Sequence, residues 1–125
     1  MIAPRRTLVL GGTRSGKSRH AEDLLPADAP VCYVATARVD PDDAGAWARP
    51  DVPAAVGRRM AELVDAVAAC AGTAVLVSAE VGLGVVPATR AGRLFRDELG
   101  ALNAALAAAC DQVLLLVAGL PLRLK

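Results

Sequence analysis

Mainly apolar runs and longer amphipathic stretches follow one another along the chain, and their spacing predicts different elements. The runs at residues 8–10, 31–35, 73–78 and 113–118 are typical of buried strands. The stretches at 19–25, 51–71 and 89–110 have the spacing of helices, and a turn at Gly119 precedes a short edge strand. Because strands and helices alternate, we expect an α/β fold of three layers, with a mostly parallel sheet and helices on both faces.

Two of the predicted helices carry an apolar stripe on the side expected to cover the sheet. In the helix that Asp51 caps and Gly72 ends, the stripe consists of Val52, Val56, Met60, Leu63, Val64 and Val67. Its solvated face consists of Arg58, Arg59, Glu62 and Asp65. In the helix at 89–110, the expected buried side consists of Ala91, Leu94, Leu102, Ala105, Leu106 and Ala109.

A glycine-rich turn follows the first predicted strand and has the spacing of a phosphate-binding loop, G-x-x-x-x-G-K-[ST]. Its residues are Gly11, Gly12, Thr13, Arg14, Ser15, Gly16, Lys17 and Ser18. Glycines let backbone N–H groups turn toward phosphate oxygens, and the following helix begins in the same concavity. We expect Lys17 to reach the β- and γ-phosphates and the Ser18 hydroxyl to bind Mg²⁺. The loop predicts binding of a nucleoside triphosphate.

Glu80 follows directly after the predicted strand at 73–78. A carboxylate at the carboxyl end of a strand, on a sheet whose first strand carries a phosphate-binding loop, is well placed to position Mg²⁺. A structural hydrogen-bonding role is the alternative. Glu80 is therefore the acidic candidate for catalysis and for the metal, beside Lys17 and Ser18.

Two further groups of polar residues allow two interpretations each. The segment Thr36, Ala37 and Arg38 either contacts the nucleotide or simply ends the strand at 31–35. The aspartates between residues 39 and 50 either hold Mg²⁺ or form turns, and Trp47 is expected to pack.

Arg90, Arg93 and Asp97 share one face of the last predicted helix because they lie three and four residues apart. They form either an anion-binding arginine pair steered by a carboxylate or a surface ion pair.

Composition narrows the class of partner. The chain has 125 residues, which suits one nucleotide-binding domain over 1–125, and its 14 basic and 13 acidic residues leave no footprint for nucleic acid. The three cysteines, Cys32, Cys70 and Cys110, lack metal-binding spacing and are expected to be buried thiols. Without a signal-like segment or an apolar run of membrane-spanning length, we expect a cytoplasmic protein.

A second motif identifies a family. The stretch Glu80-Val81-Gly82-Leu83-Gly84-Val85-Val86-Pro87, followed by Arg90, Arg93, Phe95-Arg96-Asp97, Gly100 and Asn103, resembles the bifunctional adenosylcobinamide kinase/adenosylcobinamide-phosphate guanylyltransferase family of cobalamin biosynthesis. The stretches Gly11–Glu22 and Tyr33–Ala37 and the end of the chain from Asp111 resemble the same family.

This resemblance implies an enzyme that phosphorylates the aminopropanol hydroxyl of adenosylcobinamide with ATP or GTP. It also implies transfer of GMP from GTP to the product through a guanylylated histidine, and a homo-oligomer whose active site lies near a subunit contact.

The middle of the chain departs from the family pattern. The acceptor histidine should follow soon after Arg38, but the single histidine of the chain is His20, on the helix after Ser18, where a packed or capping role is commoner. Ala79 stands where the family usually has asparagine. A non-catalytic or partly active nucleotide-binding relative that has lost guanylyl transfer is therefore the alternative function.

Overall fold

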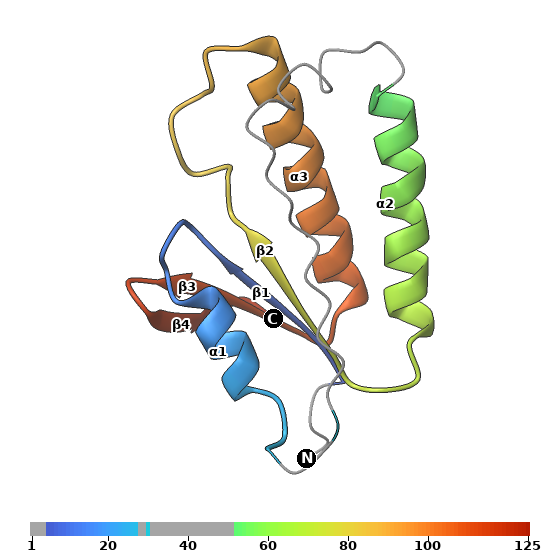
Figure 1. The fold of residues 1–125 in the computed structure, drawn as a ribbon, viewed down its shortest axis with the longest axis vertical. Coiled ribbons are helices and arrows are strands. Elements are labelled where there is room, and N and C mark those ends of the chain that lie inside the picture. The colour runs from blue at the N-terminus through green and yellow to red at the C-terminus, as the bar shows by residue number, and fades with distance from the viewer. Residues whose placement is uncertain (1–4, 28–29, 31–51) are drawn as a thin grey trace.

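A computed structural model describes residues 5–27, 30 and 52–125 as three helices and four strands (Figure 1). In chain order the elements are β1 (Arg6–Gly11), α1 (Lys17–Asp23), α2 (Val52–Ala69), β2 (Ala74–Ala79), α3 (Arg90–Ala109), β3 (Gln112–Val117) and β4 (Leu120–Arg123).

The four strands form one sheet in the order β2-β1-β3-β4. Strand β1 is parallel to both neighbours, and β4 pairs with β3 in the antiparallel direction. In the register of the sheet, Gly11 lies opposite Ala79 of β2 and opposite Leu116 of β3. The carboxyl ends of the three parallel strands therefore meet at one edge, which is where open α/β sheets bind ligands.

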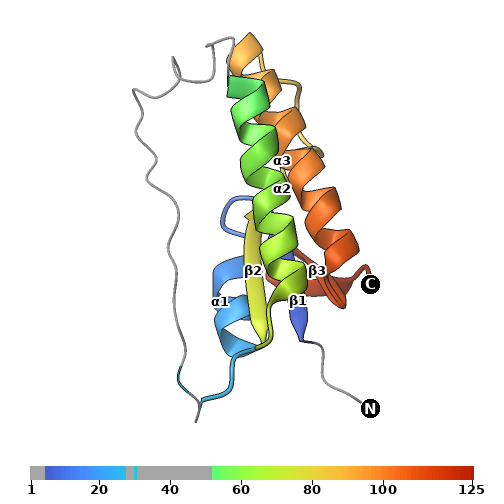
Figure 2. The same cartoon turned by 90° about the vertical axis from the view of Figure 1, so that its right-hand side faces the viewer.

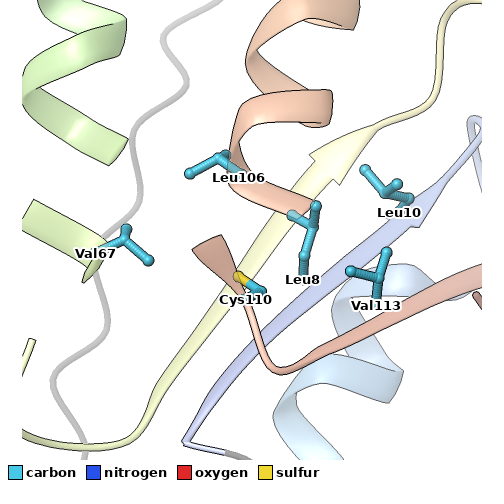
Figure 3. Close-up of a cluster of buried hydrophobic side chains, with 6 residues drawn as sticks. All are labelled: Leu8, Leu10, Val67, Leu106, Cys110 and Val113. Atoms are coloured by element: carbon cyan, nitrogen blue, oxygen red, sulfur yellow. The ribbon is translucent and has the colours of Figure 1, made fainter. Parts of the chain in front are cut away.

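Side chains of alternate strand residues separate into two apolar clusters, one on each face of the sheet. On one face Leu8, Leu10 and Val113 pack with Val67 of α2 and Leu106 of α3 (Figure 3). On the other face, Ala21 of α1 packs in a cluster with strand residues Val9, Leu114 and Leu116. The described residues thus form the expected three layers, with α1 on one face and the α2–α3 pair on the other.

Helices α2 and α3 run side by side along one face of the sheet (Figure 2). Val67 of α2 is buried, and Val56, Met60 and Val64 are half-buried, as the stripe predicts. Leu63 is an exception, because 40% of it is exposed. All four polar residues expected on the solvated face of α2 are exposed.

Helix α3 begins as expected, because the hydroxyl of Thr89 accepts a hydrogen bond from the Gly92 amide at 3.0 Å and caps the helix. Leu106 is buried and Leu94 and Leu102 are half-buried, in agreement with the predicted side. Asn103 is also buried there, although its side chain is polar.

Several element boundaries differ from the expectation by one or two residues, and two of them have a local reason. Helix α2 ends at Ala69 rather than at Gly72, because the Cys70 amide bonds the Val67 carbonyl and tightens the last turn. Strand β2 ends at Ala79 rather than Ser78, because its ladder with β1 continues to Gly11. The expected strand at 31–35, the aspartates of the 39–50 segment, Trp47 and Cys32 lie outside the described residues.

Of the two cysteines in the described part of the chain, one meets the expectation of a buried thiol. Cys110 is buried and Cys70 half-buried, and both are free thiols. Burial raises the pKa of the Cys110 thiol above its ordinary value. None of the described helices is long and apolar enough to cross a membrane.

Candidate functional site

The predicted phosphate-binding loop connects the carboxyl end of β1 to the first residue of α1, Lys17. Gly16, which precedes the helix, has a φ of +87°, a left-handed conformation that glycine adopts without strain. The Ser15 amide donates to the Gly12 carbonyl at 3.3 Å, which closes the turn. The loop therefore has the compact form that its glycine spacing predicts.

Gly11 is required by close packing inside this loop. A Cβ atom at position 11 would lie 2.2 Å from the Ser15 hydroxyl oxygen and 3.3 Å from the Leu116 carbonyl oxygen. Ser15 is buried, and its hydroxyl has no hydrogen-bond partner among the described atoms. The absence of a side chain at Gly11 thus leaves room for the buried Ser15 side chain within the loop.

The two residues expected to act on phosphate and metal are adjacent at the start of α1. The Lys17 ammonium donates a hydrogen bond to the Gly12 carbonyl at 3.0 Å, so its side chain lies back across the loop. Ser18 is exposed on the first turn of the helix. An ammonium and a hydroxyl thus lie together at the loop, the pair that phosphate and magnesium recognition requires.

Glu80 lies beside the phosphate-binding loop, because its backbone amide donates to the Gly11 carbonyl at 2.9 Å. Its carboxylate oxygen Oε1 accepts a hydrogen bond from the Gly82 amide at 2.7 Å. Both candidate roles of Glu80 are therefore compatible with its position, since its carboxylate shapes the turn at 80–82 and its backbone amide is bonded to the loop.

A cleft of about 380 Å³ joins the loop to Glu80. It is lined by Gly12, Thr13, Arg14, Ser15, Glu80, Leu83, Leu115, Leu116, Val117 and Ala118. Its volume falls in the range of small-molecule sites. The structure thus brings the loop and the acidic candidate into one cleft, as expected from adjacent parallel strands.

The residues after Glu80 form a loop that two arginines of α3 hold in place. Arg96 donates to the Gly82 carbonyl at 2.6 Å, and Arg93 donates to the carbonyls of Pro87 and Ala88, both at 3.2 Å. Between these anchors Leu83, Val85 and Val86 are 82%, 95% and 64% exposed. The loop is therefore fixed at both ends and presents apolar side chains outward.

The interpretation of Arg93 and Asp97 as an ion pair is wrong. Within the described ranges the structure holds one ion pair, between Arg59 and Glu62 of α2. Arg93 instead donates hydrogen bonds to backbone carbonyls just before the helix. Residue spacing along the sequence does not predict this choice of partner.

Two contributors to the site are given no role by the sequence motifs, although Asn103 belongs to the second motif. The turn between β3 and β4 lies at the same end of the sheet as the phosphate-binding loop (Figure 1), and the Gly119 amide donates to the Ser15 carbonyl at 3.0 Å. Asn103 bonds the last two residues of β2, just before Glu80. A polar residue within an apolar stripe was the available signal for Asn103.

The remaining site predictions concern the metal and the second strand. Within residues 5–27, 30 and 52–125, no group of three or more His, Cys, Asp or Glu side chains gathers to hold a metal ion. The oxygens of Ser18 and Glu80 are of the type that Mg²⁺ prefers, with the other positions left to phosphate and water. Thr36, Ala37 and Arg38 lie outside the described residues.

Comparison with known proteins gives consistent matches over nearly the whole chain. The family model described as cobinamide kinase / cobinamide phosphate guanyltransferase matches residues 7–49 and 48–124. The bifunctional adenosylcobalamin biosynthesis protein CobU of Salmonella typhimurium is 31% identical, covering 94% of this chain and 98% of that protein. CobP of Pseudomonas aeruginosa, with the same description, is 32% identical over 96% and 97%, and CobU of Escherichia coli is 28% identical over 94% and 98%.

These alignments also locate an internal difference. The alignment with the Escherichia coli protein has 181 positions, more than the 125 residues of this chain, so that relative carries internal residues with no counterpart here. The family model matches in two segments that meet at residues 48–49. The middle of the chain is thus shorter than in its relatives, as the sequence pattern predicts.

Proposed function

Because the chain belongs to the cobinamide kinase / cobinamide phosphate guanyltransferase family, we propose that it transfers a phosphoryl group from ATP or GTP to the aminopropanol hydroxyl of adenosylcobinamide, and then GMP from GTP to the product. The observation that carries this proposal is a cleft lined by residues 12–15 of the phosphate-binding loop and by Glu80. The chain over 1–125 then acts as one nucleotide-binding domain in the cytoplasm, as a homo-oligomer.

The loop supplies the recognition of the triphosphate. Backbone amides from Gly11 to Ser18 surround the phosphates, and Lys17 leaves the Gly12 carbonyl to bind the β- and γ-phosphate oxygens. Lysine serves this purpose because its ammonium is a compact charge on a flexible stem. The segment Thr36, Ala37 and Arg38, which follows the stretch predicted from sequence to be a strand, adds contacts to the nucleotide.

Ser18 and Glu80 provide oxygens for Mg²⁺, Ser18 from the start of α1 and Glu80 from the end of β2. When bound, the ion neutralises charge on the transferring phosphoryl group. Glu80 is already held at this edge by the hydrogen bond from its backbone amide to the Gly11 carbonyl. During transfer a bond forms between the substrate hydroxyl oxygen and the γ-phosphorus, and the bond from the γ-phosphorus to the oxygen that bridges it to the β-phosphate breaks. ADP or GDP then leaves, and the hydroxyl proton passes to water.

A second candidate function separates the two activities of the family. The chain has one histidine, His20, and lacks the internal residues that its relatives carry around positions 48–49. These observations favour a relative that keeps nucleotide binding and phosphoryl transfer but has lost guanylyl transfer through a histidine.

One experiment distinguishes the two functions. The purified chain is incubated with adenosylcobinamide, Mg²⁺ and either ATP or GTP, and the corrinoid products are identified by mass. Accumulation of the corrinoid phosphate alone supports the kinase with lost guanylyl transfer. Formation of the guanylylated corrinoid, together with an acid-labile GMP–protein adduct from GTP labelled at the α-phosphate, supports both activities. Nucleotide binding without any corrinoid product contradicts the proposed kinase.

A further inference from the structure

Asn103 is a polar side chain buried in the interface between α3 and the sheet. Only 5% of it is exposed, and it borders a cleft of about 340 Å³ whose lining includes Leu10, Val113 and Glu80. Asparagine is a weaker helix former than leucine or alanine, and burial of its amide is unfavourable unless both ends are bonded. A packing role alone would be filled better by an apolar residue.

Both ends of the Asn103 amide bond the last residues of β2. Oxygen Oδ1 accepts a hydrogen bond from the Ser78 hydroxyl at 2.5 Å, and nitrogen Nδ2 donates to the Ala79 carbonyl at 3.0 Å. The bond to Ala79 fixes the amide orientation, because a flipped amide would place its oxygen against the Ala79 carbonyl oxygen, whereas the Ser78 hydroxyl can donate or accept.

The Ala79 carbonyl belongs to the same peptide group as the Glu80 amide. That amide donates to the Gly11 carbonyl at 2.9 Å, at the beginning of the phosphate-binding loop. One peptide plane is therefore held at its oxygen by Asn103 and at its nitrogen by Gly11. Because the peptide unit is planar, the two bonds together set the direction in which the chain enters Glu80.

We propose that Asn103 is a positioning residue for the Glu80 carboxylate. By fixing the peptide plane before Glu80, it holds the carboxylate at the end of β2, where Glu80 lines the cleft beside the phosphate-binding loop. This inference rests on the proposed role of Glu80 in assisting Mg²⁺ at the nucleotide. The Gly82 amide, which donates to Glu80 Oε1 at 2.7 Å, completes the restraint from the other side.

The competing explanation is that Asn103 only ties α3 to β2. Both explanations predict lower stability when the side chain is changed, because Ser78 and Ala79 lose buried partners. Only the positioning role predicts that the substitution also changes how Mg²⁺ affects nucleotide binding, and that this change depends on Glu80.

The test measures the dissociation constant of a non-hydrolysable GTP analogue with and without Mg²⁺. The variants are Asn103→Leu, Glu80→Gln and the double variant, with Leu106→Ala as the control. Leu106 is 3% exposed on the same helix face, so Leu106→Ala lowers stability by loss of packing while leaving the Ala79–Glu80 peptide bonded.

We expect Asn103→Leu to lower the Mg²⁺-dependent gain in affinity about tenfold. In the Glu80→Gln background the same substitution should lower this gain by less than about twofold further, because the effects of residues that act as a unit are not additive. Leu106→Ala should leave the gain within about twofold of the unchanged chain. If Asn103→Leu does not fold, Ser78→Ala replaces it in the test. This variant removes one of the two hydrogen bonds of the Asn103 amide and should also lower the Mg²⁺-dependent gain in affinity.

An unchanged gain in Asn103→Leu, an additive double variant or an equal loss in Leu106→Ala would overturn the inference. An unaffected Glu80→Gln would also overturn it, because Asn103 would then have no carboxylate to position. The binding measurement contains no corrinoid, so failure of corrinoid phosphorylation is read separately and leaves this result interpretable.

Discussion

The backbone amide of Gly119 donates a hydrogen bond to the carbonyl of Ser15 at 3.0 Å. This bond joins the turn between β3 and β4 to the middle of the phosphate-binding loop, more than a hundred residues earlier in the chain. Val117 and Ala118 also line the cleft that contains the loop. The turn is therefore part of the support of the nucleotide site.

This turn carries strain that one substitution should relieve. Ala118 and Gly119 have φ values of +52° and +77°, the pattern of a type I′ hairpin turn, for which Asn-Gly is preferred. Ala118→Asn should raise the free energy of unfolding by about 0.5–1 kcal/mol, because asparagine tolerates the left-handed region better than alanine. Urea denaturation measures the change.

The matched control is Gly119→Ala. A Cβ at position 119 meets nothing within 4 Å, so its effect comes from the positive φ alone, and it should destabilise the fold by about 1 kcal/mol. If Ala118→Asn destabilised the chain or Gly119→Ala had no effect, the conformation assigned to this turn would be wrong.

Gly11→Ala should disrupt the phosphate-binding loop. The new methyl group would collide with the buried Ser15 hydroxyl, and the Leu116 carbonyl on the adjacent strand restricts movement. We expect a loss of about 1–3 kcal/mol in stability, as for overpacked sites, together with weaker nucleotide binding. Thermal unfolding and titration with GTP measure the two effects.

Gly12→Ala serves as the comparison, because a Cβ at position 12 meets nothing within 4 Å. Its unfolding free energy should stay within about 0.5 kcal/mol of the unchanged chain. Equal destabilisation by the two substitutions would contradict the close packing assigned to Gly11.

The buried thiol of Cys110 should lower the stability of the fold at alkaline pH. Desolvation raises the pKa of this thiol in the folded chain, so the unfolded chain releases the proton at lower pH. Stability should therefore be unaffected by the thiol below its ordinary pKa, and should fall as pH rises above it toward the raised value. Urea denaturation at several pH values between 7 and 10 should show a steeper fall for the unchanged chain than for Cys110→Ala. Parallel profiles would contradict the prediction.

The sequence predicts most of the described fold because its signals are local. The apolar runs, the stripe that includes Met60 and Val64, and the start of the last helix near Thr89 each depend on neighbouring residues, and the structure confirms them in the described part of the chain. Leu63 differs because the width of a buried stripe depends on how α2 packs against α3. Such packing is absent from the periodicity of one helix.

The candidate site likewise has features that local sequence signals predict and features that they do not. The phosphate-binding loop and Glu80 were predictable because a motif and the strand order specify them. The contacts of Gly119 with Ser15 and of Asn103 with Ala79 join segments far apart in the chain, and the accepting group in each is a backbone carbonyl, which every residue has. Arg93 was misassigned for the same reason, since its partners are the carbonyls of Pro87 and Ala88 rather than the carboxylate four residues away.

The most direct test of the central claim is phosphoryl transfer to the corrinoid by the unchanged chain and by Lys17→Met. GTP and ATP labelled at the γ-phosphate are supplied with Mg²⁺ and adenosylcobinamide, and label in the corrinoid is followed over time. We predict labelled corrinoid phosphate from the unchanged chain and at least about a hundredfold lower rate from Lys17→Met, because charge stabilisation at the transferring phosphate is lost. Nucleotide binding by the unchanged chain with no label in the corrinoid would contradict the account.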